Sequence, residues 1–171
     1  MTFKELLAKY VSGNLSTLQL PLVAQTGLTE GLESESLIIL AGLDNNENGF
    51  VVNQYFRRSI DELNIELPDK RTAALQYAFG IAKDIIERKR EVIEAFPEMC
   101  YKAILSYHFE EETINYVYDS IFFERLYGLY HEYDDLLAVH VPGDAIYEKE
   151  TNEIKNLMLT ELIKWTEKIR R

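Results

Sequence analysis

The sequence predicts a single all-α domain of about six to eight helices, and three observations lead to this fold class. The stretch 69–90 carries apolar residues at helical spacing over its whole length. Signals for the start and the end of helices recur along the chain, and no stretch shows the clear alternation of a half-buried strand. With 171 residues, 47% of them hydrophobic, the chain is long enough to bury a sizeable core.

The long helix over 69–90 is predicted to be the central packing element. Asp69 follows Pro68 and can cap the first turn. Gly80 costs helix stability, which close approach of a second helix would explain. Two adjacent apolar stripes give the helix a face that two neighbours can cover, and these stripes are Ala74, Ala78, Ile81 and Ile85, and Leu75, Phe79, Ala82 and Ile86.

Two helices are predicted at the N-terminal end. Thr2 and Glu5 form a capping box, so the first helix should run to about Ser12 and stop at Gly13. Pro21 suits the first turn of a second helix, which should end near 27–31.

Two further helices are predicted before the long one. Ser34 can begin a short apolar helix that Gly42 closes. The next helix should span about 50–63 after a polar turn. Its predicted inward residues are Val51, Tyr55, Ile60 and Leu63.

The second half of the chain is predicted to be helical with one interruption. A short helix is predicted over 92–96, and Pro97 starts another that runs to about Tyr107. A helix over 113–130 follows, and then a loop or break over 134–144, in which 136–141 could be extended. The last helix is predicted over about 151–168. The core stripe of the last helix is Ile154, Leu157, Met158, Leu162, Trp165 and Ile169.

The stretch 31–43 reads GLESESLIILAGL, and it precedes a helix ending in SIDELNIELP and the alanine-rich long helix. In this arrangement the first half of the chain resembles a family of small, helical bacterial proteins of uncharacterised function. The resemblance implies a helical fold and carries over no site residue, because the matching residues are packing motifs. Some small acidic proteins of this kind are immunity partners of toxins, which adds an immunity or antitoxin role to the expectations.

The polar turn 44–49 matches the front of a calcium-binding loop. Asp44, Asn46 and Asn48 place side-chain oxygens at the first three ligand positions, and Gly49 follows where such loops turn sharply. The position that needs a bidentate Glu is occupied by Tyr55. The alternative is an Asn-rich turn that caps the following helix.

The three histidines, His108, His131 and His140, lie in the second half of the chain, with carboxylates nearby. A metal-dependent hydrolase would use His131, Glu132 and Asp135, although the second histidine of an HExxH pattern is missing. The alternative is a set of unrelated polar histidines. The lone Cys100 excludes an internal disulfide and a cysteine zinc site. No phosphate-binding loop or nucleophile motif is present, so no cofactor is predicted.

The most informative feature is regional. Residues 101–147 hold nine acids against two cations, and eight of the eleven tyrosines. Tyrosine is enriched at protein interfaces, and an acidic field attracts basic partners, so the region predicts a surface for a basic protein. In the alternative, half of the tyrosines are core residues and the acids maintain solubility. The candidate partner-binding residues are Tyr107, Glu110, Glu111, Glu112, Tyr116, Tyr127, Tyr130, Tyr133, Asp134 and Asp135.

Three functions remain open: a non-enzymatic binding protein, a metal-dependent hydrolase, and a self-associating module that forms a homodimer. The formal net charge of −11 argues against sequence-independent binding to nucleic acid. No apolar run is long enough to span a membrane, and the N-terminus lacks the apolar centre of a signal peptide. A cytoplasmic protein without membrane contact is therefore expected.

Overall fold

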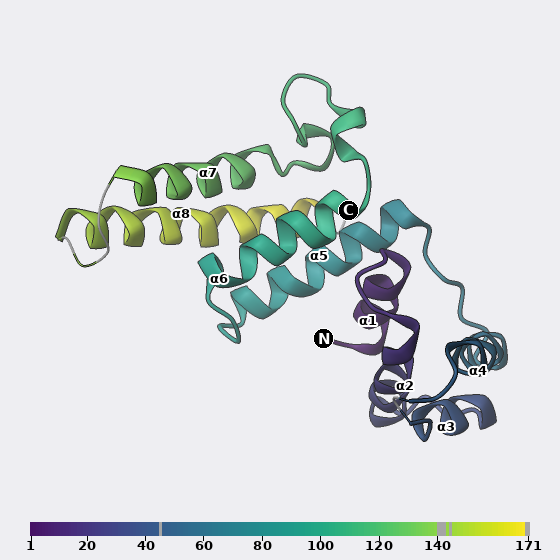
Figure 1. Ribbon diagram of the computed structural model, residues 1–171. Helices are drawn as coiled ribbons and strands as arrows, with labels where there is room; N and C mark the ends of the chain where they lie inside the picture. The colour runs from purple at the N-terminus through teal and green to yellow at the C-terminus, as the bar shows by residue number, and fades with distance from the viewer. Residues whose placement is uncertain (45, 140–142, 144, 170–171) are drawn as a thin grey trace. The chain divides into compact units, whose positions relative to one another are not determined.

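In the described part of the chain, the regular structure is entirely helical (Figure 1). The computed structural model describes residues 1–44, 46–139, 143 and 145–169. These residues form eight α-helices and no strand, so the predicted all-α class is confirmed. The chain divides into two compact units, 1–80 and 81–171, and the boundary falls inside α5 (Lys70–Ile86). That both units behave as one domain stays a prediction.

The first unit is built from short helices around one apolar core. Its elements are α1 (Phe3–Val11), the 3-10 helix η1 (Thr17–Gln19), α2 (Leu20–Thr29), α3 (Glu35–Ala41), α4 (Gly49–Glu62) and the first part of α5. The buried residues of the core are Phe3, Leu7, Leu20, Val23, Ala24, Leu37, Leu40, Val52, Phe56 and Ile60.

Local signals set the ends of these helices as predicted. The capping box at Thr2 and Glu5 is formed, with the Thr2 amide donating to Glu5 Oε2 at 2.7 Å. The Leu37 amide donates to Ser34 Oγ at 3.2 Å at the start of α3. Gly13 and Gly31 have φ angles of +79° and +86°, which glycine adopts without steric cost at a helix end.

The inward face of α4 differs from the prediction by one residue position. Val52, Phe56 and Ser59 are buried together with Ile60, whereas Val51, Tyr55 and Leu63 are only partly buried. Both sets recur every three to four residues along most of the helix, so periodicity alone could not choose between two neighbouring stripes. The stripe that contains Phe56 is the buried one, and the Phe56 ring packs edge-on against Tyr10 with 5.0 Å between the ring centroids.

The predicted role of Gly80 is supported by the position of α1. A Cβ atom added at Gly80 would lie 3.0 Å from Cγ of Glu5. Ala74, Ala78, Ile81 and Ile85 are all buried, as the stripe along α5 predicted.

The long helix ends earlier than predicted, at Ile86 rather than near residue 90. Arg88 adopts a left-handed conformation with φ of +58°. The Lys89 amide then donates to the Asp84 carbonyl at 2.8 Å, which closes the helix end.

Two glycines inside helices provide a matched pair for testing packing against propensity. A Cβ at Gly128 in α7 (Glu124–Val139) would meet no atom within 4 Å, whereas one at Gly27 in α2 would lie 2.8 Å from a ring carbon of the buried Phe3. We expect Gly128→Ala to raise the free energy of unfolding by about 1 kcal/mol, because alanine favours helix. Gly27→Ala should instead lower it by about 1–3 kcal/mol, because the Phe3 ring must move. Urea unfolding of both variants measures this, and stabilisation by both would contradict the predicted clash.

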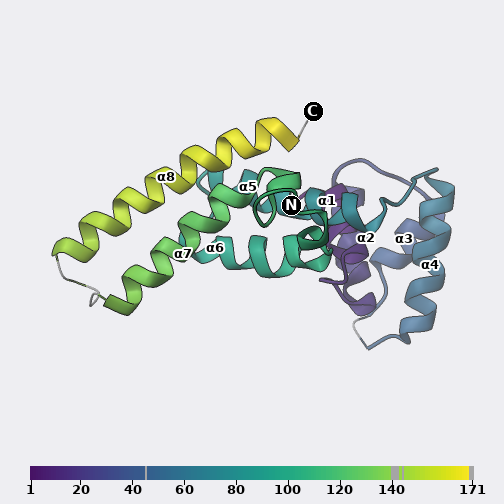
Figure 2. The same cartoon turned by 90° about the horizontal axis from the view of Figure 1, so that it is seen from above.

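The second unit contains two long antiparallel helices and an irregular segment. Its elements are the end of α5, α6 (Val92–Pro97), the π-helix η2 (Glu98–Ala103), the 3-10 helices η3 (Ile104–Ser106), η4 (Phe109–Glu112) and η5 (Asp119–Ile121), α7 (Glu124–Val139) and α8 (Ala145–Ile169). Helices α7 and α8 lie side by side in both views (Figures 1 and 2).

Aromatic side chains form much of the core of this unit. The ring of Phe96 stacks on Phe123 and on Tyr130, with centroid distances of 5.6 and 5.0 Å. Trp165 meets Phe123 edge-on at 5.7 Å and donates its indole N–H to the Ile121 carbonyl at 2.9 Å. This buried hydrogen bond ties α8 to the irregular segment before α7.

Several predictions for the second half were wrong in their boundaries. Pro97 is the last residue of α6 rather than the start of a helix, and the chain continues through η2 and η3. No α-helix covers 113–123. The chain there is irregular except for η5, and α7 begins only at Glu124. The predicted loop over 134–144 is helical as far as Val139, which also rules out an extended piece over 136–139. Residues 140–142 and 144 of that prediction lie outside the described residues.

The last helix begins at Ala145, before the predicted residue 151, and α8 is the longest helix described. Met158, Leu162 and Trp165 are buried as predicted. Leu157 is exposed, and Ile154 and Ile169 are only partly buried. Tyr147, Thr151 and Thr166 complete the buried face instead.

Candidate partner-binding surface

The residues predicted to bind a partner fall on two parts of the second unit. Tyr107, Glu110, Glu111, Glu112 and Tyr116 belong to the irregular segment 107–123, and Tyr127, Tyr130, Tyr133, Asp134 and Asp135 belong to α7. The first group contains three exposed residues and the second group one.

One carboxylate organises the irregular segment. Oδ1 of Asp119 accepts a hydrogen bond from the Ile114 amide at 2.9 Å, and its Oδ2 accepts from the amides of Asn115 and Tyr116 at 2.7 and 3.0 Å. These three N–H donors lower the pKa of Asp119 below its ordinary value, because they stabilise the charged form. The carboxylate therefore pins three consecutive residues of a loop that has no regular structure of its own.

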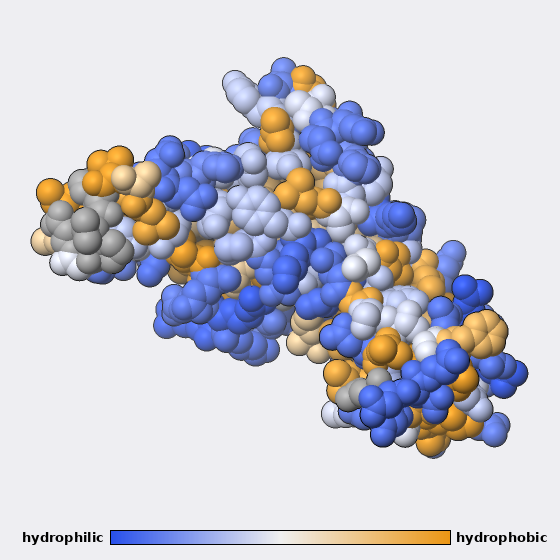
Figure 3. All heavy atoms as spheres, in the orientation of Figure 1, coloured by the Kyte–Doolittle hydropathy of each residue, from blue (hydrophilic) through white to orange (hydrophobic). Residues whose placement is uncertain are grey.

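The pinned loop turns apolar side chains toward solvent. Ile114 is 77% exposed and Tyr116 is 71% exposed, and Val117 and Phe122 are also exposed. Beneath them, Phe109, Tyr118 and Ile121 are buried and anchor the segment. Hydrophilic and hydrophobic residues lie intermixed over this segment, at the top of the view in Figure 3. Exposed apolar side chains gathered on a fixed backbone are typical of interaction surfaces.

The same segment is uniformly acidic. Residues 107–123 contain Glu110, Glu111, Glu112 and Asp119 and no lysine or arginine. Glu110 and Glu111 are exposed in η4. The Glu110 carboxylate lies 3.1 Å from Nδ1 of His108, and hydrogen bonds from its own backbone N–H and from that ring lower its pKa. We call this segment, with its exposed acids and apolar side chains, the acidic 107–123 surface.

The tyrosines of the region divide between core and surface. Tyr118, Tyr130 and Tyr147 are buried, so the core alternative holds for these three. Tyr130, which was predicted to contact a partner, is therefore a core residue. Burial raises the pKa of Tyr118 to about 12. Tyr101 and Tyr116 are the large exposed members.

The rest of the predicted partner-binding set on α7 is less available than the acidic 107–123 surface. Tyr127, Tyr133 and Asp134 are partly buried, and Asp135 is exposed. Burial, and then a hydrogen bond with Tyr147, raise the pKa of Tyr133 to about 12. The Tyr133 hydroxyl is therefore already engaged inside the unit.

The structure does not assemble the residues of the predicted hydrolase site. Over the described residues, no group of three or more His, Cys, Asp or Glu side chains could hold a metal ion. The His131 ring packs edge-on against Tyr127 at 4.5 Å, and Glu132 forms an ion pair with Arg125 at 3.1 Å. His140 lies outside the described residues.

Two of the three side chains of the predicted calcium loop, Asp44 and Asn48, accept hydrogen bonds from nearby backbone amides. Oδ1 of Asp44 accepts from the Asn46 amide at 3.0 Å, and Oδ1 of Asn48 accepts from the Phe50 amide at 2.9 Å as the N-cap of α4. These contacts are those of the turn-and-cap alternative. Residue 45 lies outside the described residues.

Sequence reasoning missed Ile114, Val117 and Phe122 as surface residues. Their helical spacing was part of the pattern that predicted a helix over 113–130. Asp119 was a usable signal. An Asp side chain can accept hydrogen bonds from backbone amides a few residues earlier, and these bonds compete with those of a helix.

Comparisons with protein families, curated proteins and solved structures found no match. Over the described residues, no helix has the length and apolar character that crossing a membrane would need.

Proposed function

We propose that this chain is a non-enzymatic binding protein that docks a basic protein on the acidic 107–123 surface, with an immunity or antitoxin role as the most specific form. The observation that carries the proposal is the Asp119 carboxylate, which accepts three backbone hydrogen bonds and holds Ile114 and Tyr116 in solvent. A loop that is fixed before binding loses little conformational entropy when a partner docks.

The chemistry of the surface favours a basic partner. The apolar side chains would supply contact area, because tyrosine buries a large surface with few rotatable bonds. Glu110 and Glu111 would attract lysine and arginine and speed the encounter. The second unit already contains a contact of this type, since Nζ of Lys168 lies 4.9 Å from the centre of the exposed Phe122 ring.

Charge reversal tests the electrostatic part of the proposal. The tagged protein is used to capture partners from its native lysate at low and at high salt. We expect a basic protein to be retained at low salt and to bind more weakly at high salt, because salt screens exposed charges. We further expect Glu110→Lys with Glu111→Lys to abolish its retention at low salt, with a loss in affinity of about tenfold or more.

The control for this variant is Glu33→Lys with Glu66→Lys in the first unit. Both control residues are exposed, and the change in net charge is the same. The circular dichroism spectrum and the melting temperature of both double variants should equal those of the parent. If the control variant lost binding equally, the effect would be due to net charge and not to this surface. If the Glu110/Glu111 variant still bound the partner, the acidic 107–123 surface would not be the binding site.

A second variant tests the apolar part without changing charge. Tyr116→Ser with Ile114→Ser removes two side chains that are largely exposed and contribute little to the core. We expect affinity for the captured partner to fall by about tenfold to a hundredfold, because exposed aromatic anchors dominate interface energies. Isothermal titration calorimetry measures this, and an unchanged dissociation constant would show that the partner binds elsewhere.

A further inference from the structure

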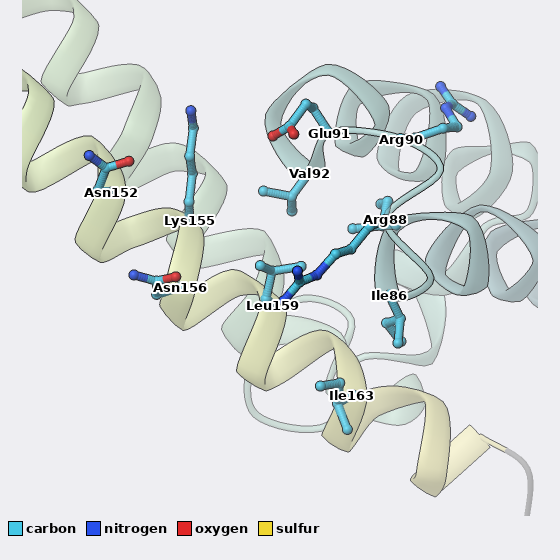
Figure 4. A pocket seen from close by; sticks show the side chains of 11 residues that line it. Ile86, Arg88, Arg90, Glu91, Val92, Asn152, Lys155, Asn156, Leu159 and Ile163 are labelled. Carbon is cyan, nitrogen blue, oxygen red and sulfur yellow. The ribbon is translucent and has the colours of Figure 1, made fainter.

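A groove in the second unit lies between the α5–α6 connection and α8 (Figure 4). Its volume is about 470 Å³, which is within the range of small-molecule sites. Its apolar lining comes from Ile85 and Val92 on one side and from Leu159 and Ile163 on α8. None of these residues belongs to the acidic 107–123 surface, so a ligand in this groove would be independent of the proposed function.

The groove is unusual for an acidic chain because it gathers cations. Arg88, Arg90 and Lys155 line it, against the single carboxylate of Glu91. Arg90 is neutralised by Glu98 at 2.8 Å. Arg88 and Lys155 form no ion pair in the part of the chain that the structure describes. Two uncompensated cations therefore border one apolar hollow in a protein whose formal net charge is −11.

The backbone at Arg88 gives no reason for an arginine. Its φ angle of +58° is in the left-handed region, where glycine or asparagine would close the helix at lower steric cost. Figure 4 shows the Arg88 side chain extending from this turn toward α8, and both Arg88 and Leu159 line the groove. The side chain thus brings a planar cation to a groove that also has an apolar lining.

Polar side chains of α8 complete the rim. Asn152, Lys155 and Asn156 line the groove beside Leu159. In Figure 4, the Lys155 ammonium and the Glu91 carboxylate lie on opposite sides of the hollow. The arrangement offers donors for an anionic group and an apolar lining for a hydrocarbon body.

We propose that this groove binds a small amphipathic acid, that is, an apolar chain of several carbons that ends in a carboxylate or a phosphate. Arg88 holds the acid group, because the guanidinium fork matches both anions with two parallel hydrogen bonds. Lys155 adds a second positive charge at the rim. Val92, Leu159 and Ile163 contact the apolar chain.

The test is a titration of the isotope-labelled full-length chain, monitored by amide chemical shifts. The probes are octanoate, hexyl phosphate, inorganic phosphate and 1-octanol. We expect octanoate, hexyl phosphate or both to shift the amide resonances around Arg88, Val92 and Leu159 in a saturable way. The ratio of the two dissociation constants then identifies the preferred acid group. Inorganic phosphate and 1-octanol should each bind at least tenfold more weakly, because each lacks one half of the ligand.

Two variants separate the site from the fold. Arg88→Gly removes the cation and relieves the left-handed backbone, so the melting temperature should be equal or higher while affinity for the acid falls at least tenfold. Lys155→Glu should also lower this affinity. The control is Lys149→Glu on the same helix, where an exposed lysine lies 3.9 Å from Glu153 and outside the groove. Octanol binding equal to that of octanoate, undiminished binding by Arg88→Gly, or absence of saturable binding of either acid would overturn the proposal.

Discussion

Replacing Trp165 by alanine is expected to lower the free energy of unfolding by about 3–5 kcal/mol, the typical cost of removing a large buried aromatic ring. Trp165 is 1% exposed and meets Phe123 edge-on. Its loss also leaves the buried Ile121 carbonyl without the indole donor at 2.9 Å. Chemical denaturation of the variant measures the change.

Two further variants resolve this effect. Trp165→Phe keeps an aromatic ring but removes the donor, so its expected cost is smaller, at about 1–3 kcal/mol. Leu157→Ala alters an exposed residue on the same helix and should change the free energy by less than about 0.5 kcal/mol. If Leu157→Ala destabilised as much as Trp165→Ala, the buried face of α8 would be misassigned.

Removing the Asp119 carboxylate is expected to release the loop that it pins. In Asp119→Ala the amides of Ile114, Asn115 and Tyr116 lose their acceptor, so they should become the residues with the largest gain in hydrogen exchange. The aromatic core around Phe96 does not use this carboxylate, so its protection should persist. Hydrogen exchange measured by NMR gives both results in one experiment.

The same contact predicts a dependence on pH. The pKa of Asp119 is lowered in the folded state, so its contribution to order is complete above the ordinary carboxyl pKa and is lost as the pH falls through the lowered value. Asp119→Asn, which keeps the shape and removes the charge, should show faster exchange at neutral pH and no such acid transition. If exchange at the three amides were unchanged in both variants, the loop would be held by its buried anchors alone.

Loss of the pinned loop also bears on binding. Under the proposed function, Asp119→Ala should weaken the binding of a basic partner, although the carboxylate itself is occupied by backbone donors. Glu110→Lys with Glu111→Lys should weaken the same binding through its change in charge, while the loop keeps its conformation. The two variants therefore separate the shape of the acidic 107–123 surface from its electrostatic field.

The candidate surface was predictable in composition and not in form. The acids and tyrosines between residues 101 and 147 are visible in the sequence. Whether a given tyrosine is core or surface depends on residues far away in the chain, as with Tyr130 against Phe96. The exposed position of Ile114 results from a side chain that competes with the helix for backbone donors.

By itself, the sequence determined the all-α class and the ends of the helices in the first half. Capping by Thr2, Ser34 and Asn48 and chain reversal at Gly13 act over a few residues, so they are readable without the fold. Tertiary structure alone decided which stripe of α4 and α8 is buried and which tyrosines of the 101–147 region are core residues. In those places several local patterns fit the same residues, and burial against distant side chains chose among them.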